Sequence, residues 1–185
     1  MPIELWTARM ERPLSEQERE AILPLLPPAL RERLVRMREV EKQREPLCAY
    51  LILCLALRQR YGWKSLPEVA LNQLGKPYFP EHPGVHFNLS HSSGAVLVGL
   101  SDQPIGVDIE RIRPVGQRIM VRLAHVSTEE AFFQSWVRRE ARAKRSGSGL
   151  GTVMRSESPL QPGEYYYELD TFPGYAAGLA TRSKE

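Results

Sequence analysis

The sequence predicts an α+β fold, and three observations lead to that class. Residues 47–61 and 127–145 have the length and composition of helices, and short strand-like segments surround both. Strands and helices do not alternate regularly, as a parallel sheet built from βαβ units would need. No low-complexity linker separates the two parts, and no residue-level repeat relates them. We therefore expect two halves, each with one long helix and a few strands, that meet near Gln103.

The first half begins with a strand and then becomes helical. Ile3 to Arg9 is strand-like, and Ser15 with Glu18 has the spacing of a capping box that opens a helix. After a charged stretch, the long helix is expected to start at Pro46, because proline fits the first turn of a helix. Gly62 suits its C-terminal end.

Turns and short strands fill the middle of the chain, and a helix with two closing strands completes it. Gly75 to Pro80 is rich in turn-forming residues. Ser127 and Glu130 again have capping-box spacing, and the helix that they open is expected to end at Gly147. The expected strands are 85–89, 95–100, 105–109, 164–170 and 175–181.

Composition narrows the class of protein. Of the 185 residues, 42% are hydrophobic and 25% are charged, which is typical of a folded globular chain. The net charge of +3 permits an anionic ligand or an acidic partner but does not indicate nucleic acid. The longest apolar run, Leu47 to Leu57, is about half of the roughly 20 residues that a membrane helix needs. We expect no nucleic-acid or membrane partner.

Cysteine usage and the start of the chain bear on its location. The only cysteines, Cys48 and Cys54, lie in the apolar run, which favours buried thiols in a reducing compartment over a disulfide or a metal site. The first residues have no basic segment followed by an apolar one, so no signal peptide is visible. These features predict a cytoplasmic location.

Two acids lie on one predicted strand. Asp108 and Glu110 are two residues apart, so their side chains point to the same face of that strand. Two carboxylates on one face repel each other unless a cation or water relieves them, and hard oxygen ligands suit Mg²⁺ beside a substrate phosphate. The alternative is a solvated strand face with Arg111 and Arg113 as neighbours.

The second long helix brings an acid and a lysine together. Trp136, Glu140 and Lys144 are spaced i, i+4, i+8 and so share one helical face. Glu140 is the only acid between residues 136 and 145, among several arginines. The face either points to a common site or carries an ordinary Glu–Lys pair in solvent.

Weaker signals come from other polar residues. His91, in a stretch of small polar side chains from Asn88 to Ser92, is able to donate to a phosphate oxygen, or is a turn histidine. The basic stretch from Arg31 to Arg44 either lies in solvent or binds phosphate through arginine. The histidines lack the spacing and acidic neighbours of a metal site.

Four motifs follow one another along the chain. They are Gly75-Lys76-Pro77, then Phe87-Asn88-Leu89-Ser90-His91-Ser92, then Gly106-Val107-Asp108-Ile109-Glu110, then Trp136-x-x-x-Glu140-Ala141-x-x-Lys144-x-x-Gly147-x-Gly149-Leu150. In order and spacing they resemble the Sfp-type 4′-phosphopantetheinyl transferases, over roughly residues 30 to 182. The combination is specific, although a lone G-x-D-x-E would not be.

The resemblance implies a fold and a metal site. The family fold is a pseudodimer of two α+β halves, each a small antiparallel sheet packed on a long helix, with the active site in the cleft between them. The halves here would be residues 1–103 and 104–185. Asp108, Glu110 and Glu140 would hold Mg²⁺ together with the pyrophosphate of coenzyme A, and Mn²⁺ is an alternative because the ligands are oxygens.

The resemblance also implies contacts with coenzyme A. Lys144 would contact its phosphates, and Lys76 and Pro77 would lie along its adenine. Ser90 and His91 would bind phosphate. Basic residues of the first half, with Arg44 the best placed and Arg31, Arg33 and Arg36 near it, would hold the 3′-phosphate.

The implied reaction moves phosphopantetheine from coenzyme A to a serine of an apo acyl, peptidyl or aryl carrier protein, as a holo-acyl-carrier-protein synthase does, and releases 3′,5′-ADP. Asp108, Glu140 and Lys144 would be catalytic, and a monomer would suffice. The carrier could serve fatty-acid, polyketide or non-ribosomal peptide synthesis. The alternatives are a non-catalytic relative that binds coenzyme A or a carrier protein, and a Mg²⁺-dependent phosphohydrolase.

Two features depart from the family pattern. Arg139 replaces the usual lysine before the helix glutamate and keeps its charge. The 25 residues between Glu110 and Trp136 are fewer than in many relatives, and carrier proteins often dock on that interval.

Overall fold

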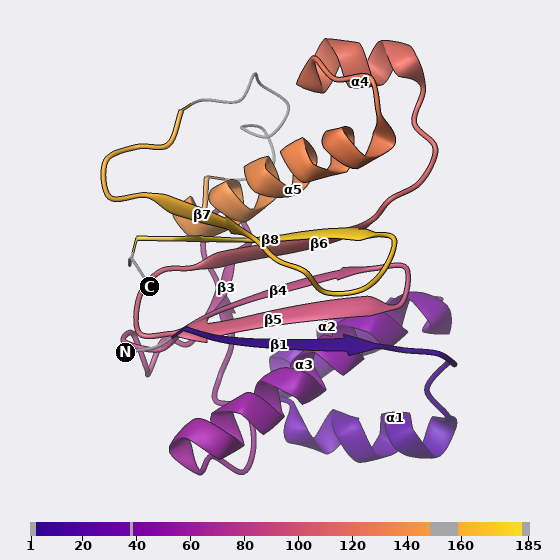
Figure 1. The fold of residues 1–185 in the computed structure, drawn as a ribbon. Helices are drawn as coiled ribbons and strands as arrows, with labels where there is room; N and C mark the ends of the chain where they lie inside the picture. Colours follow the sequence, from indigo (N-terminus) through magenta and orange to yellow (C-terminus); the bar gives the residue numbers. More distant parts are fainter. Residues whose placement is uncertain (1–2, 38, 149–158, 183–185) are drawn as a thin grey trace.

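The chain folds into layers of helix and sheet (Figure 1). The computed structural model describes residues 3–37, 39–148 and 159–182. Two three-stranded antiparallel sheets lie in the middle, and a small two-stranded sheet lies apart from them. Helix α3 covers one side of the strands and helix α5 covers the other (Figure 1). The predicted α+β class is confirmed.

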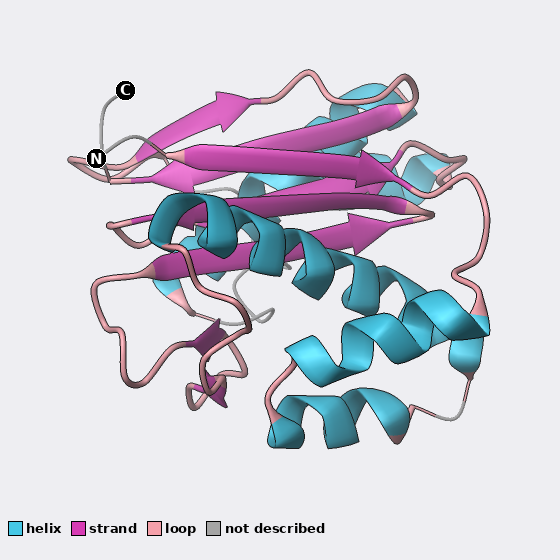
Figure 2. Cartoon of the chain, turned by 90° about the horizontal axis from the view of Figure 1, so that it is seen from below, coloured by secondary structure: helices cyan, strands magenta, loops and turns pink. Residues whose placement is uncertain are grey.

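The first sheet has the strand order β1-β5-β4. Figure 2, seen from below, shows helices gathered on its outer face, and α1, α2 and α3 pack there. The elements of this half are β1 (Glu4–Arg9), α1 (Glu16–Ile22), η1 (Leu23–Leu25), α2 (Pro28–Val35), α3 (Val40–Tyr61), β2 (Ala70–Leu71), β3 (Pro77–Tyr78), β4 (His86–Ser92) and β5 (Ala95–Ser101).

The second sheet has the order β6-β8-β7, with the last strand of the chain in the centre, as β5 is in the first. In both sheets a strand, a long helix and two further strands follow one another along the chain. The elements are β6 (Gly106–Arg111), α4 (Gln117–Ala124), α5 (Glu129–Ser146), β7 (Tyr165–Glu168) and β8 (Tyr175–Thr181).

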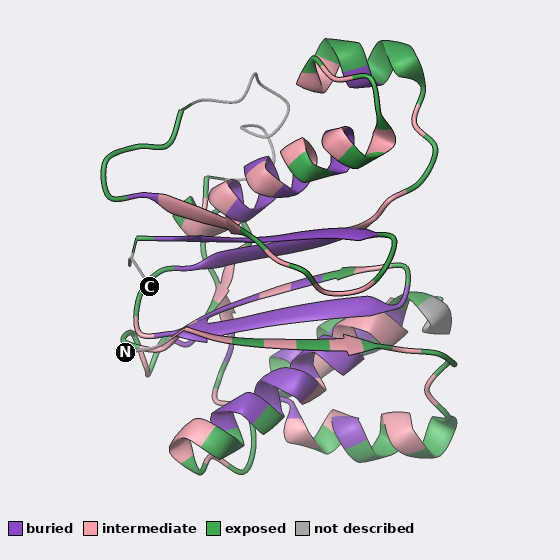
Figure 3. Ribbon diagram, in the orientation of Figure 1, coloured by how far each residue is buried: buried purple, intermediate pink, exposed green. Residues whose placement is uncertain are grey.

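The central strands β5 and β8 are buried along their whole length (Figure 3). On β5, Val96 and Val98 pack toward α3, whereas Leu97 packs with Ile109 of β6 and Leu179 of β8. Because alternate residues of a strand point to opposite faces, the inner face of β5 meets the second sheet directly. Strand β5 therefore contributes to two cores, one beneath α3 and one between the two sheets.

The long helices differ from expectation at their starts. Helix α3 begins at Val40, so the prediction that it starts at Pro46 is wrong, and the proline lies inside the helix. One turn earlier, the buried Gln43 donates from Nε2 to the Met37 carbonyl at 2.7 Å, which ties this segment to the preceding loop. Helix α5 is capped by Thr128 rather than Ser127, and its predicted end at Gly147, with φ of 69°, is confirmed. Helix α4 was not expected.

Cys48 and Cys54 are buried and free, as predicted. Burial raises the pKa of the Cys54 thiol to about 11, so this thiol is inert near neutral pH.

Among the helices of the described residues, none combines the length and apolarity needed to cross a membrane.

Candidate functional site

A row of polar side chains joins the two sheets where β4 lies beside β6. The N–H groups of Val107 and Ile109 on the edge of β6 donate to Asn88 Oδ1 and Ser90 Oγ of β4, at 2.8 and 3.1 Å. The Arg111 N–H donates to Ser92 Oγ at 3.2 Å. The two strands run side by side in the same direction, and side chains replace the backbone bonds of a ladder. We call this contact the β4–β6 seam.

Asp108 is the centre of the site. It lies on β6 and is 3% exposed. Its Oδ1 accepts hydrogen bonds from Ser90 Oγ at 2.8 Å and from Lys144 Nζ at 2.5 Å. Its Oδ2 is buried and has no hydrogen-bond partner among the described residues. A buried carboxylate oxygen without a partner is costly, so this atom is available to a cation.

Gly106 brings α5 against this strand. A side-chain carbon at Gly106 would overlap the backbone of Ala141 and Arg145 on α5. Only glycine lets the two backbones approach so closely. The first residue of the Gly-Val-Asp-Ile-Glu motif is therefore a packing requirement, and it places Lys144 within reach of Asp108.

Glu140 is a buried acid on the same face of α5. It is 7% exposed, and no hydrogen bond of its carboxylate is found within residues 3–37, 39–148 and 159–182. Burial raises its pKa, the charges of Asp108 and Glu110 raise it further, and Lys144 lowers it. A carboxylate whose pKa is raised in this way is a better proton acceptor than an exposed glutamate.

Glu110 lies two residues after Asp108 on β6 and accepts hydrogen bonds from two side chains. Its Oε2 accepts from Ser92 Oγ at 2.9 Å and from Arg113 at 2.9 Å. Within the described residues, Asp108, Glu110 and Glu140 do not converge closely enough to form a metal-binding cluster. Their chemistry still fits Mg²⁺, because they are oxygen donors that repel one another and because Asp108 Oδ2 is unpaired.

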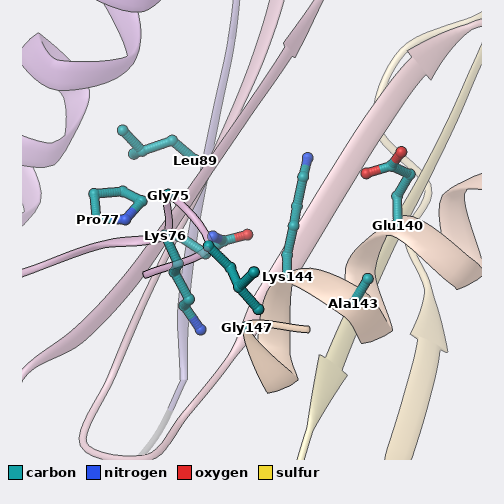
Figure 4. A pocket seen from close by; sticks show the side chains of 10 residues that line it. Gly75, Lys76, Pro77, Leu89, Glu140, Ala143, Lys144 and Gly147 are labelled. Atoms are coloured by element: carbon teal, nitrogen blue, oxygen red, sulfur yellow. The ribbon is translucent and has the colours of Figure 1, made fainter. Parts of the chain in front are cut away.

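A pocket of about 290 Å³ opens beside Lys144 (Figure 4). Glu140 and Lys144 project from α5 on one side, and Gly75, Lys76 and Pro77 form the other side. The structure thus brings the Gly-Lys-Pro turn and Glu140, which are more than 60 residues apart in the sequence, onto one cavity.

Lys76 has a structural contact that the sequence does not reveal. Its Nζ donates to the carbonyls of Ile105 and Arg145, each at 3.1 Å, and so ties the Gly-Lys-Pro turn to the second half. Desolvation, with the nearby Arg145 charge, lowers the pKa of this amine to about 8. Pro77 lines the pocket without a polar role.

His91 lies on β4, and alternation directs it away from Ser90. Its Nδ1 is 2.8 Å from Oε2 of Glu45 on α3, and the Gly94 N–H donates to Oε1 of the same glutamate at 2.6 Å. Arg44 is close, since its guanidinium would lie 3.8 Å from a side-chain carbon at Gly94. Arg44 and His91 therefore gather around Glu45 rather than on the pocket.

Comparison with known proteins decides the family. Over 175 residues the chain is 31% identical to the 4′-phosphopantetheinyl transferase Sfp of Bacillus subtilis (strain 168), which covers 86% of this chain and 78% of that protein. The chain belongs to the Sfp-type 4′-phosphopantetheinyl transferases. A second phosphopantetheinyl transferase of Bacillus subtilis is 26% identical over 84% of this chain and 75% of its own length. The transferase AcpT of Escherichia coli (strain K12) is 32% identical over 50% of this chain and 55% of its own length.

A search against models of protein families found no match. The predicted resemblance is confirmed by the relatives alone, whereas the roles of individual residues stay predictions. Gly149 and Leu150 of the helix motif, and Arg38 of the basic stretch, lie outside the described residues.

In this Sfp-type transferase the arginines of α5 support the fold. Arg142 and Arg145 bind the buried Glu164, Arg142 with two bonds at 3.0 and 2.9 Å. The buried Arg139 donates to the Leu123 carbonyl at the end of α4. Glu164, which sequence reasoning missed, offsets part of the positive charge of this helix.

A second hollow of about 280 Å³ lies between α4 and α5, next to the acids. Its walls are mostly apolar side chains, among them Ile119, Phe132 and Trp136, and Glu110 and Arg113 form one rim. Trp136 is half-buried and stacks on Phe132, with ring centroids 6.1 Å apart. Trp136 thus lines the hollow between the two helices.

Proposed function

We propose that this chain transfers the 4′-phosphopantetheine group of coenzyme A to a serine of an apo carrier protein and releases 3′,5′-ADP. One observation carries the proposal. In a member of this family, Asp108, Glu140 and Lys144 lie together at the β4–β6 seam, beside a pocket whose opposite wall is the Gly-Lys-Pro turn.

The proposed reaction balances as a phosphoryl transfer. The serine oxygen of the carrier bonds to the β-phosphorus of coenzyme A, and the bond from that phosphorus to the oxygen of 3′,5′-ADP breaks. Glu140 takes the serine proton, for which its raised pKa suits it. Lys144 moves from Asp108 toward the phosphates and stabilises the charge on the departing 3′,5′-ADP.

Asp108, Glu110 and Glu140 are the residues that would hold Mg²⁺ or Mn²⁺. When bound, such an ion neutralises the pyrophosphate and polarises its phosphorus. The unpaired Oδ2 of Asp108 supports this role, and the amine of Lys144 and the guanidinium of Arg113 balance the acids in the ligand-free chain.

We place coenzyme A between the two halves, residues 1–103 and 104–185. We regard these halves as a pseudodimer within one chain, so that a monomer is sufficient for activity. The matching strand orders of the two sheets support this view. Lys76 and Pro77 would line the adenine side, and Ser90, His91 and Arg44 would line the phosphate side.

We place the carrier protein on the hollow between α4 and α5. This hollow adjoins Glu110, and the nearby Arg118 and Arg122 of α4 are exposed, so they are able to meet an acidic partner.

Mass spectrometry of an apo acyl carrier protein tests the proposal. Incubation with coenzyme A, Mg²⁺ and this chain should add one phosphopantetheine to the carrier and release 3′,5′-ADP. Asp108→Asn should abolish the mass increase, whereas Glu20→Gln on the exposed face of α1 should leave it unchanged. Nucleotide release without modification of the carrier would show a phosphohydrolase, and neither product would show a binding protein.

A further inference from the structure

Glu45 lies where an anionic ligand would be expected. It follows Arg44 on α3 and binds His91 Nδ1 at 2.8 Å and the Gly94 N–H at 2.6 Å. A carboxylate has no proton to give, so Nδ1 is the donor. We call Arg44, Glu45, His91 and Gly94 the Glu45 cluster.

The donors of the Glu45 cluster are those that bind phosphates in proteins: a guanidinium, an imidazole and a backbone N–H. Here a carboxylate of the chain already takes two of them. The Glu45 side chain is 23% exposed and that of His91 is 39% exposed, so the cluster is open to solvent and to a ligand.

The charge of Glu45 has a direct consequence for a bound phosphate. A phosphate that reaches His91 through its other ring nitrogen meets a fixed negative charge one side chain away. Like charges at such a distance repel, and the repulsion is only partly screened at a half-exposed site. The same carboxylate acts less on a ligand without that phosphate, because the repulsion between like charges falls with distance.

We infer that Glu45 sets the donor specificity of this transferase by weakening the contribution of the 3′-phosphate to binding. This inference rests on the proposed function, in which Arg44 and His91 line the phosphate side of the coenzyme A site, and it takes their phosphate to be the 3′-phosphate that the resemblance assigns to Arg44. The relevant quantity is the ratio of kcat/KM for 3′-dephospho-coenzyme A to kcat/KM for coenzyme A. This ratio is then higher in the wild type than in a variant with a neutral residue at position 45.

Glu45→Gln removes the charge and keeps the size of the side chain. The amide oxygen still accepts from the Gly94 N–H, and the amide NH₂ donates to Nδ1 of His91 in the tautomer that carries its proton on Nε2. Glu45→Ala is the second variant, and Glu20→Gln on α1 is the matched control. Circular dichroism melting checks that each variant is folded.

Two measurements give the result. The first is kcat/KM with coenzyme A and with 3′-dephospho-coenzyme A, with apo acyl carrier protein as acceptor. The second is calorimetric binding of 3′,5′-ADP and 5′-AMP, which needs no turnover. Glu45→Gln should raise the preference for the 3′-phosphorylated compound about fivefold in both measurements, through KM in the kinetic one. The values for the compounds without that phosphate should change by a smaller factor. Glu20→Gln should change neither ratio.

An unchanged ratio in both Glu45 variants, or a shift toward the compounds without the 3′-phosphate, would overturn the inference. The second result would mean that Glu45 supports phosphate binding by orienting His91. If wild-type chain transfers nothing but binds both nucleotides, the proposed function fails while the binding ratio still decides the role of Glu45. If neither nucleotide binds, both proposals fail.

Discussion

At the scale of single residues, charge and burial explain the chemistry of the site. Asp108 shares one oxygen with Ser90 and Lys144 and leaves the other unpaired, while Glu140 is buried beside it. Burial and the charges of Asp108 and Glu110 raise the pKa of Glu140, so the group suits a cation and a proton. A solvated strand face, the alternative for Asp108 and Glu110, would show none of these features.

Glu140→Gln separates proton transfer from binding. If Glu140 takes the serine proton, this variant should lower kcat by about 10²-fold or more, the usual contribution of a general base, with a smaller change in the affinity for coenzyme A. Steady-state kinetics and calorimetric binding of coenzyme A give the two numbers. Equal losses in both would argue for a metal-binding role alone.

Lys76 predicts a pH dependence of stability. Its pKa is about 8 in the folded chain against an ordinary value of 10.5, so folding disfavours its charged form. Between these values the unfolded chain binds more protons, and the contribution of Lys76 to the free energy of unfolding rises with pH. Below about pH 8 the penalty is present in full, and above about 10.5 it is gone.

Urea denaturation between pH 7 and pH 10 measures this contribution. The stability of the wild type should rise relative to that of Lys76→Met, which has no titrating amine. A pH-independent difference between the two proteins would contradict the lowered pKa.

At the scale of elements, the placing of α5 decides whether the site exists. Glycine at position 106 allows the helix to touch β6, and the Glu164 carboxylate fixes the helix through Arg142 and Arg145. Glu140 and Lys144 then face the acids of β6 because they are spaced four residues apart on one face of that helix.

Gly106→Ala should push α5 from β6. The added methyl group overlaps the backbone of the helix, which side-chain rotation is unable to relieve, so we expect a loss of about 3 kcal/mol in the free energy of unfolding. Gly84→Ala, where a side-chain carbon meets nothing within 4 Å, is the control and should stay within about 0.5 kcal/mol. Equal stability of the two variants, measured in urea, would show that α5 moves without cost.

At the scale of the whole molecule, the two sheets depend on each other. The seam satisfies the exposed N–H groups of β6 with side chains of β4, and the two inner faces share one core. A further bond joins the halves, from the Tyr175 hydroxyl to the Ser93 carbonyl at 2.7 Å. Since neither inner face would be covered alone, neither half should be stable by itself.

Unfolding should therefore be a single cooperative transition. Trp136 reports on the second half, and Trp6 and Trp63 report on the first. Fluorescence of Trp136→Phe then reports on the first half, and fluorescence of the double variant Trp6→Phe with Trp63→Phe reports on the second. After the stability change of each variant is subtracted, both fluorescence midpoints in urea should equal the midpoint from circular dichroism. Two separated midpoints would show that the halves unfold independently.

Much of this molecule follows from the sequence alone. The α+β class, the main strands, the glycine end of each long helix and the order of the four motifs are visible, because periodicity and turn residues act over short distances. The start of α3 was misplaced, because proline is expected in the first turn of a helix and Pro46 lies inside this one. Helix α4 has no capping side chain at its N-terminus, so the sequence lacks the usual start signal for it.

Only the tertiary structure decides which polar residues serve the site and which serve the fold. The Asn-x-Ser-x-Ser pattern of β4 meets amides 19 residues further along the chain, and Lys76 meets carbonyls on the other half. Arg142 and Arg145 of α5 bind Glu164, and His91 binds Glu45. Such pairings join distant segments whose closeness is set by packing, so the sequence determined the chemistry available while the fold determined its use.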